Sequence, residues 1–80
     1  MEKKLVEIFR LANTLSDNKY KVYAQIEYSA TEQKELNLSI RSKSDYSYLE
    51  KCNIQLNQSY VTLDSIILLL RYYIGRQDNE

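Results

Sequence analysis

The feature that most constrains the fold is an alternation of apolar and polar residues between positions 19 and 30. Every second residue in this segment is apolar or aromatic: Tyr20, Val22, Ala24, Ile26, Tyr28 and Ala30. Successive side chains of a strand point to opposite faces, so the pattern predicts a strand that is buried on one face only. The chain therefore contains a sheet, and the apolar face of that sheet needs a cover.

A second alternating run covers residues 35–43, and only the short polar segment 31–34 separates it from the first. A parallel return would need a dozen or more residues, so the two runs predict an antiparallel hairpin. Placing both apolar sets on one face permits one such register. It pairs Tyr28 with Leu36, Ile26 with Leu38, and Ala24 with Ile40.

The segment after the hairpin is less regular. Ser44-Asp45 has the composition of a turn, and apolar or aromatic residues then stand at even positions until Leu49-Glu50 interrupts the alternation. Such an interruption is typical of a bulge, a turn or a short helical coil. We expect a third strand over 52–58 and an irregular, tyrosine-bearing link over 44–51.

Both ends of the chain carry helical patterns. Apolar residues recur at the spacing of one helical face over 2–17, where Asn18 tolerates the backbone conformation that ends helices. A second helix is expected over 62–75, from an N-cap at Thr62 to a terminating glycine at Gly75. The tail over 77–80 is expected to fray.

These elements give the order α-β-β-β-α in one small domain spanning residues 1–80. Because each strand has one apolar face, we expect a two-layer α+β fold, a three-stranded antiparallel sheet with both terminal helices on one face. This order is similar to that of double-stranded-RNA-binding domains. That family binds phosphates through a lysine cluster at the start of its second helix, where this chain has Thr62-Leu63-Asp64-Ser65. No binding residue is therefore carried over from that resemblance.

Composition excludes several classes of function. The chain has no histidine, one cysteine and one glycine, and its 11 basic residues balance 11 acidic ones. These counts remove most metal sites, all histidine-based acid–base catalysis and glycine-rich phosphate loops. Cys52 falls on the apolar side of its strand without a histidine to activate it, which indicates a small buried hydrophobe. We expect no enzymatic activity, no cofactor and no metal.

The sequence also bears on location. Charged residues interrupt the N-terminal ten residues, and the longest apolar run, 66–70, has five residues where a membrane span needs about 20. A lone cysteine fits a reducing compartment. We expect a cytoplasmic protein without membrane contact, and the composition suits an accessory protein of a bacterium, phage or mobile element.

The C-terminal helix has more apolar surface than its core stripe requires. That stripe consists of Leu63, Ile66, Ile67, Leu70 and Ile74. Leu68, Leu69 and Tyr72 project at other angles, and a helix that is apolar nearly all round is normally buried on several sides. Either Leu69 and Tyr72 pack against the N-terminal helix, or this surface binds a protein. We expect the second, with a homodimer as the commonest form of such binding.

A basic end of the polar sheet face is a second candidate surface. The predicted register places Lys21 opposite Lys43. It also places Tyr23 opposite Arg41, and Lys19 stands nearby. Cations beside an exposed tyrosine suit phosphates and a stacked base, so these five residues are the predicted nucleic-acid contacts. The alternative is a sheet edge that lysines keep soluble.

The sequence as a whole favours a small non-catalytic protein–protein interaction module. It is expected to form a homodimer through its apolar C-terminal helix. A nucleic-acid-binding accessory or regulatory factor is the alternative. Eight tyrosines among 80 residues fit either function, because tyrosine is enriched at interfaces, and they fit a coding bias equally well.

Overall fold

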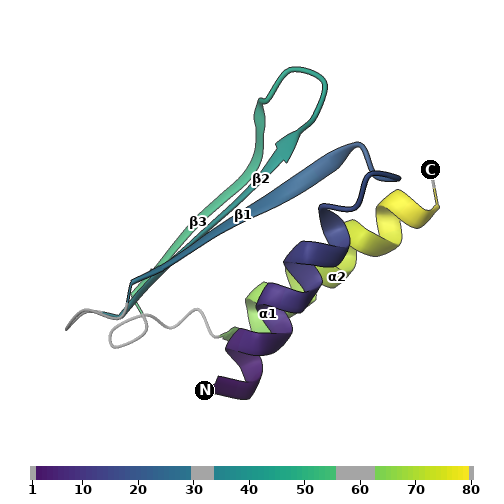
Figure 1. Cartoon of the computed structure of the whole chain (residues 1–80). Helices are drawn as coiled ribbons and strands as arrows, with labels where there is room; N and C mark the ends of the chain where they lie inside the picture. The colour runs from purple at the N-terminus through teal and green to yellow at the C-terminus, as the bar shows by residue number, and fades with distance from the viewer. Residues whose placement is uncertain (1, 30–33, 56–62, 80) are drawn as a thin grey trace.

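The computed structural model describes residues 2–29, 34–55 and 63–79. Its elements are, in order, helix α1 (Glu2–Leu15), strands β1 (Val22–Ser29), β2 (Glu35–Ser42) and β3 (Tyr48–Gln55), and helix α2 (Leu63–Asp78). The strands form one antiparallel sheet in the order β1-β2-β3. Both helices lie side by side on one face of this sheet, and none of the described elements covers the other face (Figure 1). The predicted α+β fold is confirmed.

The hairpin of β1 and β2 has the register that the alternation predicts. The pairs are Tyr28 with Leu36, Ile26 with Leu38, and Ala24 with Ile40. The even-numbered residues of β2 face the helices, and Leu36, Leu38 and Ile40 are each no more than 1% exposed. The apolar periodicity thus determines both the pairing of these strands and the face that they bury.

The connection between α1 and β1 is longer than predicted. Helix α1 ends at Leu15 rather than at residue 17, and β1 begins at Val22 rather than at residue 19. The intervening residues form turns, in which the Tyr20 backbone N–H donates to the Asp17 carbonyl at 3.1 Å. The Asp17 carboxylate also accepts from the Lys19 backbone N–H at 3.0 Å. An aspartate that binds the backbone two residues on favours a turn over the start of a strand.

Strand β3 begins earlier than predicted. It covers Tyr48–Gln55, whereas the prediction placed it over 52–58 and left 44–51 irregular. Residues 56–58 of that prediction lie outside the described part of the chain. The interruption in the pattern is a bulge, because Ile40 pairs with Glu50 while the next residue, Arg41, pairs with Tyr48. Leu49 is the extra residue, so the strand continues through the interruption.

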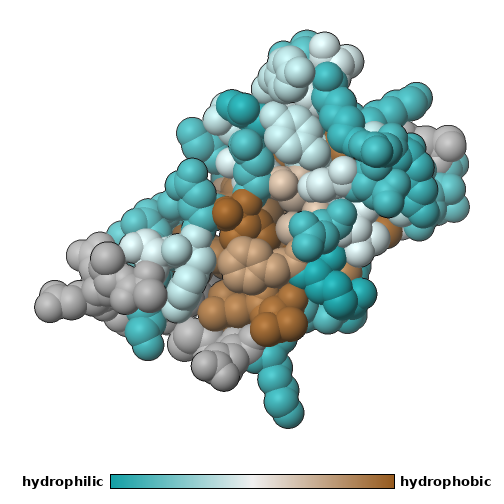
Figure 2. Space-filling model, in the orientation of Figure 1, coloured by the Kyte–Doolittle hydropathy of each residue, from teal (hydrophilic) through white to brown (hydrophobic). Residues whose placement is uncertain are grey.

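The core lies between the sheet and the two helices. Ile8 and Leu15 of α1 and Ile66 and Leu70 of α2 meet the inward side chains of β2 and are almost fully buried. Phe9 has the spacing of this inward face but is 42% exposed. Figure 2 shows apolar surface gathered over α1 and beside β1.

Helix α2 continues past Gly75, which the sequence indicates as its terminating residue. The helix extends to Asp78, and Gly75 does not have a positive φ. The Tyr20 hydroxyl donates to Asp78 Oδ1 at 2.6 Å, and the Lys21 backbone N–H donates to Gln77 Oε1 at 3.0 Å. These tertiary bonds hold the last turn, so the predicted stop at Gly75 is wrong and the predicted fraying is wrong for Gln77 and Asp78, while residue 80 lies outside the described residues. The predicted N-cap, Thr62, lies outside the described residues.

We expect Gly75→Ala to raise the free energy of unfolding by about 0.5–1 kcal/mol, because glycine inside a helix costs that much relative to alanine. A Cβ at position 75 would meet no atom of the described structure within 4 Å beyond the helix's own backbone. Thermal unfolding followed by circular dichroism measures the effect, and Tm should rise by about 2–8 °C. A lower Tm would show that this position requires glycine.

Candidate functional site

The side of α2 turned away from the sheet carries an exposed apolar pair. Leu68 is 65% and Tyr72 is 58% exposed, whereas the predicted core stripe of the same helix is buried or half-buried. Residues four apart lie on one face of a helix, so the two side chains form a single surface, which we call the outer α2 face. Leu69, the third predicted interface residue, is half-buried and packs against the core.

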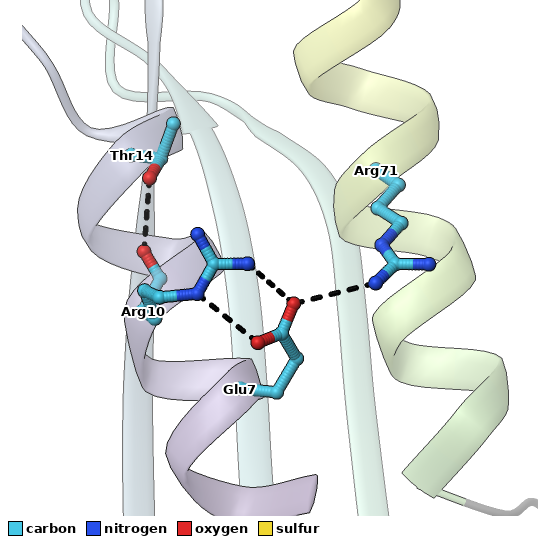
Figure 3. Close-up of polar contacts among 4 residues, drawn as sticks. All are labelled: Glu7, Arg10, Thr14 and Arg71. Carbon is cyan, nitrogen blue, oxygen red and sulfur yellow. Dashed lines mark hydrogen bonds and ion pairs between the residues drawn. The ribbon is translucent and has the colours of Figure 1, made fainter.

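Charged side chains join α1 and α2 along their outer sides. The Glu7 carboxylate accepts hydrogen bonds from Arg10 at 2.5 and 3.0 Å and from Arg71 at 3.3 Å (Figure 3). The Arg10 hydrogen bond is the main cause that holds the pKa of Glu7 below its ordinary value. Lys4 and Asp64 form a further ion pair at 3.0 Å. These exposed pairs stabilise the fold only slightly, and they leave Leu68 and Tyr72 uncovered.

Tyr73 ties α2 to the sheet. Its hydroxyl donates to Glu50 Oε1 on β3 at 2.9 Å, and the Tyr72 ring meets the Tyr73 ring edge-on with centroids 5.6 Å apart. Burial, followed by this hydrogen bond, raises the pKa of Tyr73 to about 12, so its hydroxyl remains a donor at neutral pH. The bond and the buried stripe Leu63, Ile66, Ile67 and Leu70 both turn the same side of α2 toward the sheet. This orientation turns Leu68 and Tyr72 away from the core.

The second candidate surface is the uncovered side of the sheet, which we call the open sheet face. The register places Tyr23 of β1 opposite Arg41 of β2, as predicted, and places Arg41 opposite Tyr48 of β3. The three strands therefore each contribute one side chain to a row at one end of this face. Lys51 stands two residues after the bulged Leu49 on β3 and pairs with Ser39 of β2. Its side chain lies on the open sheet face, over the Tyr48 ring.

Cations and aromatic rings contact one another at this end. The Arg41 guanidinium lies 4.1 Å from the Tyr48 ring centroid, and Lys51 Nζ lies 5.0 Å from the same centroid. The Tyr46 ring meets the Tyr23 ring edge-on at 6.5 Å. A hydrogen bond with Tyr23 is the largest cause that raises the pKa of Arg41 above its ordinary value, and the guanidinium is a cation at neutral pH in any case. We call these five residues the basic aromatic cluster.

Tyr46 has an unusual backbone conformation in the turn between β2 and β3. Its φ is 61°, in the left-handed region, and its side chain is 65% exposed. This conformation costs a residue with a Cβ about 1–2 kcal/mol, and glycine or asparagine is the usual occupant. A large aromatic residue thus occupies a position that the turn alone would not select. Its ring lies against Tyr23 of the open sheet face.

The structure places the five predicted nucleic-acid contacts in two different regions. Tyr23 and Arg41 are in the basic aromatic cluster. Lys43 Nζ donates to the Asp17 carbonyl at 2.9 Å, and Lys19 Nζ lies 4.9 Å from the Tyr20 ring centroid, so both contact the α1–β1 connection. Lys21 is exposed, and its carbonyl accepts from the Lys43 backbone N–H at 2.9 Å, which extends the predicted pairing. The prediction missed Tyr46, Tyr48 and Lys51 because it assigned them to an irregular link.

A shallow depression of about 480 Å³ on the open sheet face is lined in part by Tyr48, Lys51 and Glu27. Among its lining residues are the side-chain amides Gln25, Asn37 and Asn53. The Asn53 amide donates to the side chains of both Asn37 and Glu35. The depression therefore presents hydrogen-bond donors and acceptors beside the cations and rings.

Other chemistry has little support in the described residues. Cys52 is half-buried beside this depression, and burial, followed by the charge of Glu50, raises the pKa of its thiol. In segments 2–29, 34–55 and 63–79 no group of three or more Cys, Asp or Glu side chains is arranged to hold a metal ion. Neither α1 nor α2 has the length and apolar character that a membrane crossing demands.

No known protein family, curated protein or solved structure matches this chain.

Proposed function

We propose that this chain is a small non-catalytic interaction protein that forms a homodimer through the outer α2 face. The observation that carries the proposal is the exposure of Leu68 and Tyr72, at 65% and 58%, on the side of α2 opposite its buried stripe. Fully burying one such side chain lowers the free energy by about 1.5–3 kcal/mol. A small domain has a narrow stability margin, so covering this face stabilises it appreciably. A second copy of the chain supplies a matching apolar surface.

The arrangement of residues along α2 suits pairing with an antiparallel copy. Ser65 stands three residues before Leu68, and Gly75 stands three residues after Tyr72, so small residues flank the apolar pair symmetrically. In an antiparallel pair centred between them, Leu68 of one copy lies level with Tyr72 of the other. Serine and glycine, and equally alanine at position 75, are small enough to let the helices approach, and a two-fold contact of this kind closes the assembly at two copies.

We expect the wild-type protein to be a dimer and Leu68→Glu to raise the dimer dissociation constant at least tenfold, about the effect of a residue central to an interface. Light scattering across a size-exclusion peak at several loading concentrations gives the molar mass. Val6→Glu is the matched control, because Val6 is 66% exposed but lies on α1. A monomeric wild type at every concentration, or equal dissociation with Val6→Glu, would contradict the proposal. Circular dichroism checks that both variants are folded.

We also propose a cytoplasmic location. Cys52 is the only cysteine, so the chain cannot form an internal disulfide. Proteins of reducing compartments typically keep such thiols reduced. Fractionation of cells that express the tagged chain tests this, and recovery in a secreted or membrane fraction would contradict it.

A further inference from the structure

The open sheet face combines three kinds of group that recognise a single-stranded nucleic acid. We infer that it binds such a strand, with bases stacked on Tyr46 and Tyr48 and phosphates held by Arg41 and Lys51. The inference goes beyond the proposed dimer, because this surface lies on the opposite side of the molecule from the outer α2 face (Figure 1). Binding of a strand to the open sheet face is therefore expected whether the protein is a monomer or a dimer.

The aromatic contribution comes from rings that are both exposed and held in place. Tyr46 is 65% and Tyr48 is 50% exposed. Tyr23 contacts the Tyr46 ring, and the Arg41 guanidinium lies 4.1 Å from the centroid of Tyr48. Rings that neighbouring side chains already hold in place lose little conformational freedom when a base stacks on them. Every nucleobase has a flat face, so such stacking tolerates any sequence.

The charge at this end complements a phosphodiester backbone. Arg41 and Lys51 project from neighbouring strands, and both lie within 5.0 Å of the Tyr48 ring centroid. Phosphates bound there would lie next to a base stacked on that ring, as they do along a nucleic-acid strand. Two carboxylates share this face: Glu27 lines the depression together with Tyr48 and Lys51, and Glu35 accepts from the Asn53 amide. Neither carboxylate is part of the basic aromatic cluster, which is where the phosphates of an anionic strand would bind.

The amide side chains favour single strands over duplexes. Gln25, Asn37 and Asn53 line the depression beside Tyr48 and carry both donors and acceptors. Unpaired bases present their hydrogen-bonding edges to such groups, whereas a duplex hides those edges by base pairing. Stacking on Tyr48 likewise requires a base that has left its duplex.

The strained backbone at Tyr46 is consistent with a binding role. Its φ of 61° suits glycine or asparagine better than tyrosine. Residues held in such conformations cluster at functional sites, where the side chain's role compensates for the strain. Tyr46→Asn therefore has opposite effects on stability and on affinity. It relieves the backbone strain at position 46, and it removes the ring on which a base would stack.

Fluorescence anisotropy with labelled 12-nucleotide RNA and DNA strands of one sequence, at low and rising salt, tests the inference. Tyr48→Ser should weaken binding about tenfold, within the range for one stacked base. Lys51→Ser should reduce the slope of log affinity against log salt by about 0.7, the value for one phosphate contact on a single strand. Phe9→Ser and Lys3→Ser are matched exposed controls on α1 and should bind like the wild type.

Tyr46→Asn should bind about tenfold more weakly and yet unfold at a higher temperature, which excludes misfolding as the reason for weak binding. Tighter binding of RNA than of DNA would assign a contact to the 2′-hydroxyl, and equal binding would assign recognition to bases and phosphates. The inference is overturned if the single strands do not bind at low salt. Two further probes are a duplex of the same sequence and a polyglutamate peptide, and the inference is also overturned if either binds as tightly as the single strands. It is overturned likewise if Tyr48→Ser and Lys51→Ser bind the single strands like the controls.

Discussion

Leu38→Ala should lower the free energy of unfolding by about 2–5 kcal/mol. Leu38 lies in the middle of the central strand, is 1% exposed, and pairs with Ile26 on one side and Cys52 on the other. Truncation removes buried contacts and leaves a cavity that neighbouring strands on both sides prevent from closing. Because folded domains have only about 5–15 kcal/mol of stability, this one change removes a large part of it.

Urea unfolding followed by circular dichroism measures the loss. Leu49→Ala is the matched control, since Leu49 is the bulged residue of β3 and is 45% exposed. The control should change the free energy of unfolding by less than about 1 kcal/mol. Equal losses in the two variants would show that the inward face of β2 is not the centre of the core.

Ser16→Ala should lower the free energy of unfolding by about 1–2 kcal/mol, because it leaves the part-buried Ala24 backbone N–H without its acceptor. The Ser16 hydroxyl accepts from the Ala24 backbone N–H at 3.0 Å and donates to the Ala12 carbonyl at 2.8 Å. Strand β1 is at the edge of the sheet, so the backbone N–H groups on its outer side have no neighbouring strand among the described elements to accept their hydrogen bonds. The Ser16 hydroxyl is the acceptor for one of them, that of Ala24. Ser16 thus joins the end of α1 to β1.

Thr14→Ala is the control for this prediction. The Thr14 hydroxyl also donates to a carbonyl four residues earlier, that of Arg10, at 3.1 Å, but it is exposed (Figure 3). Its removal should change stability by less than about 0.5 kcal/mol. If the two variants lost equal stability, the bond from Ser16 to β1 would contribute nothing beyond the bond within the helix.

The two proposed surfaces have a joint consequence. The outer α2 face and the open sheet face lie on opposite sides of one domain, so occupation of one leaves the other accessible (Figure 1). A dimer through α2 would present two basic aromatic clusters to a long strand. Binding by both clusters would raise the apparent affinity without any new contact. Leu68→Glu should then weaken binding to long strands more than binding to 12-nucleotide ones.

The binding surfaces could be predicted only in part. The alternation of β1 and β2 predicts that Tyr23 lies opposite Arg41, and the apolar excess of α2 predicts that Leu68 is exposed. Tyr48 and Lys51 could not be placed, because a bulge changes the parity of every residue on one side of it. Where the bulge falls depends on which β3 residues pair with β2, and this pairing involves contacts distant in sequence.

The sequence by itself determined the elements, their order and the face that the first hairpin buries, and it permitted the register that the hairpin has. These depend on periodicity, and a shift of one residue would expose a whole apolar set. Only the tertiary structure decided where the elements end. Helix α2 runs past Gly75 because Tyr20 and Lys21 bind its last turn, and β3 begins at Tyr48 because β2 offers it partners. Local preferences of about 1 kcal/mol yield to such tertiary contacts.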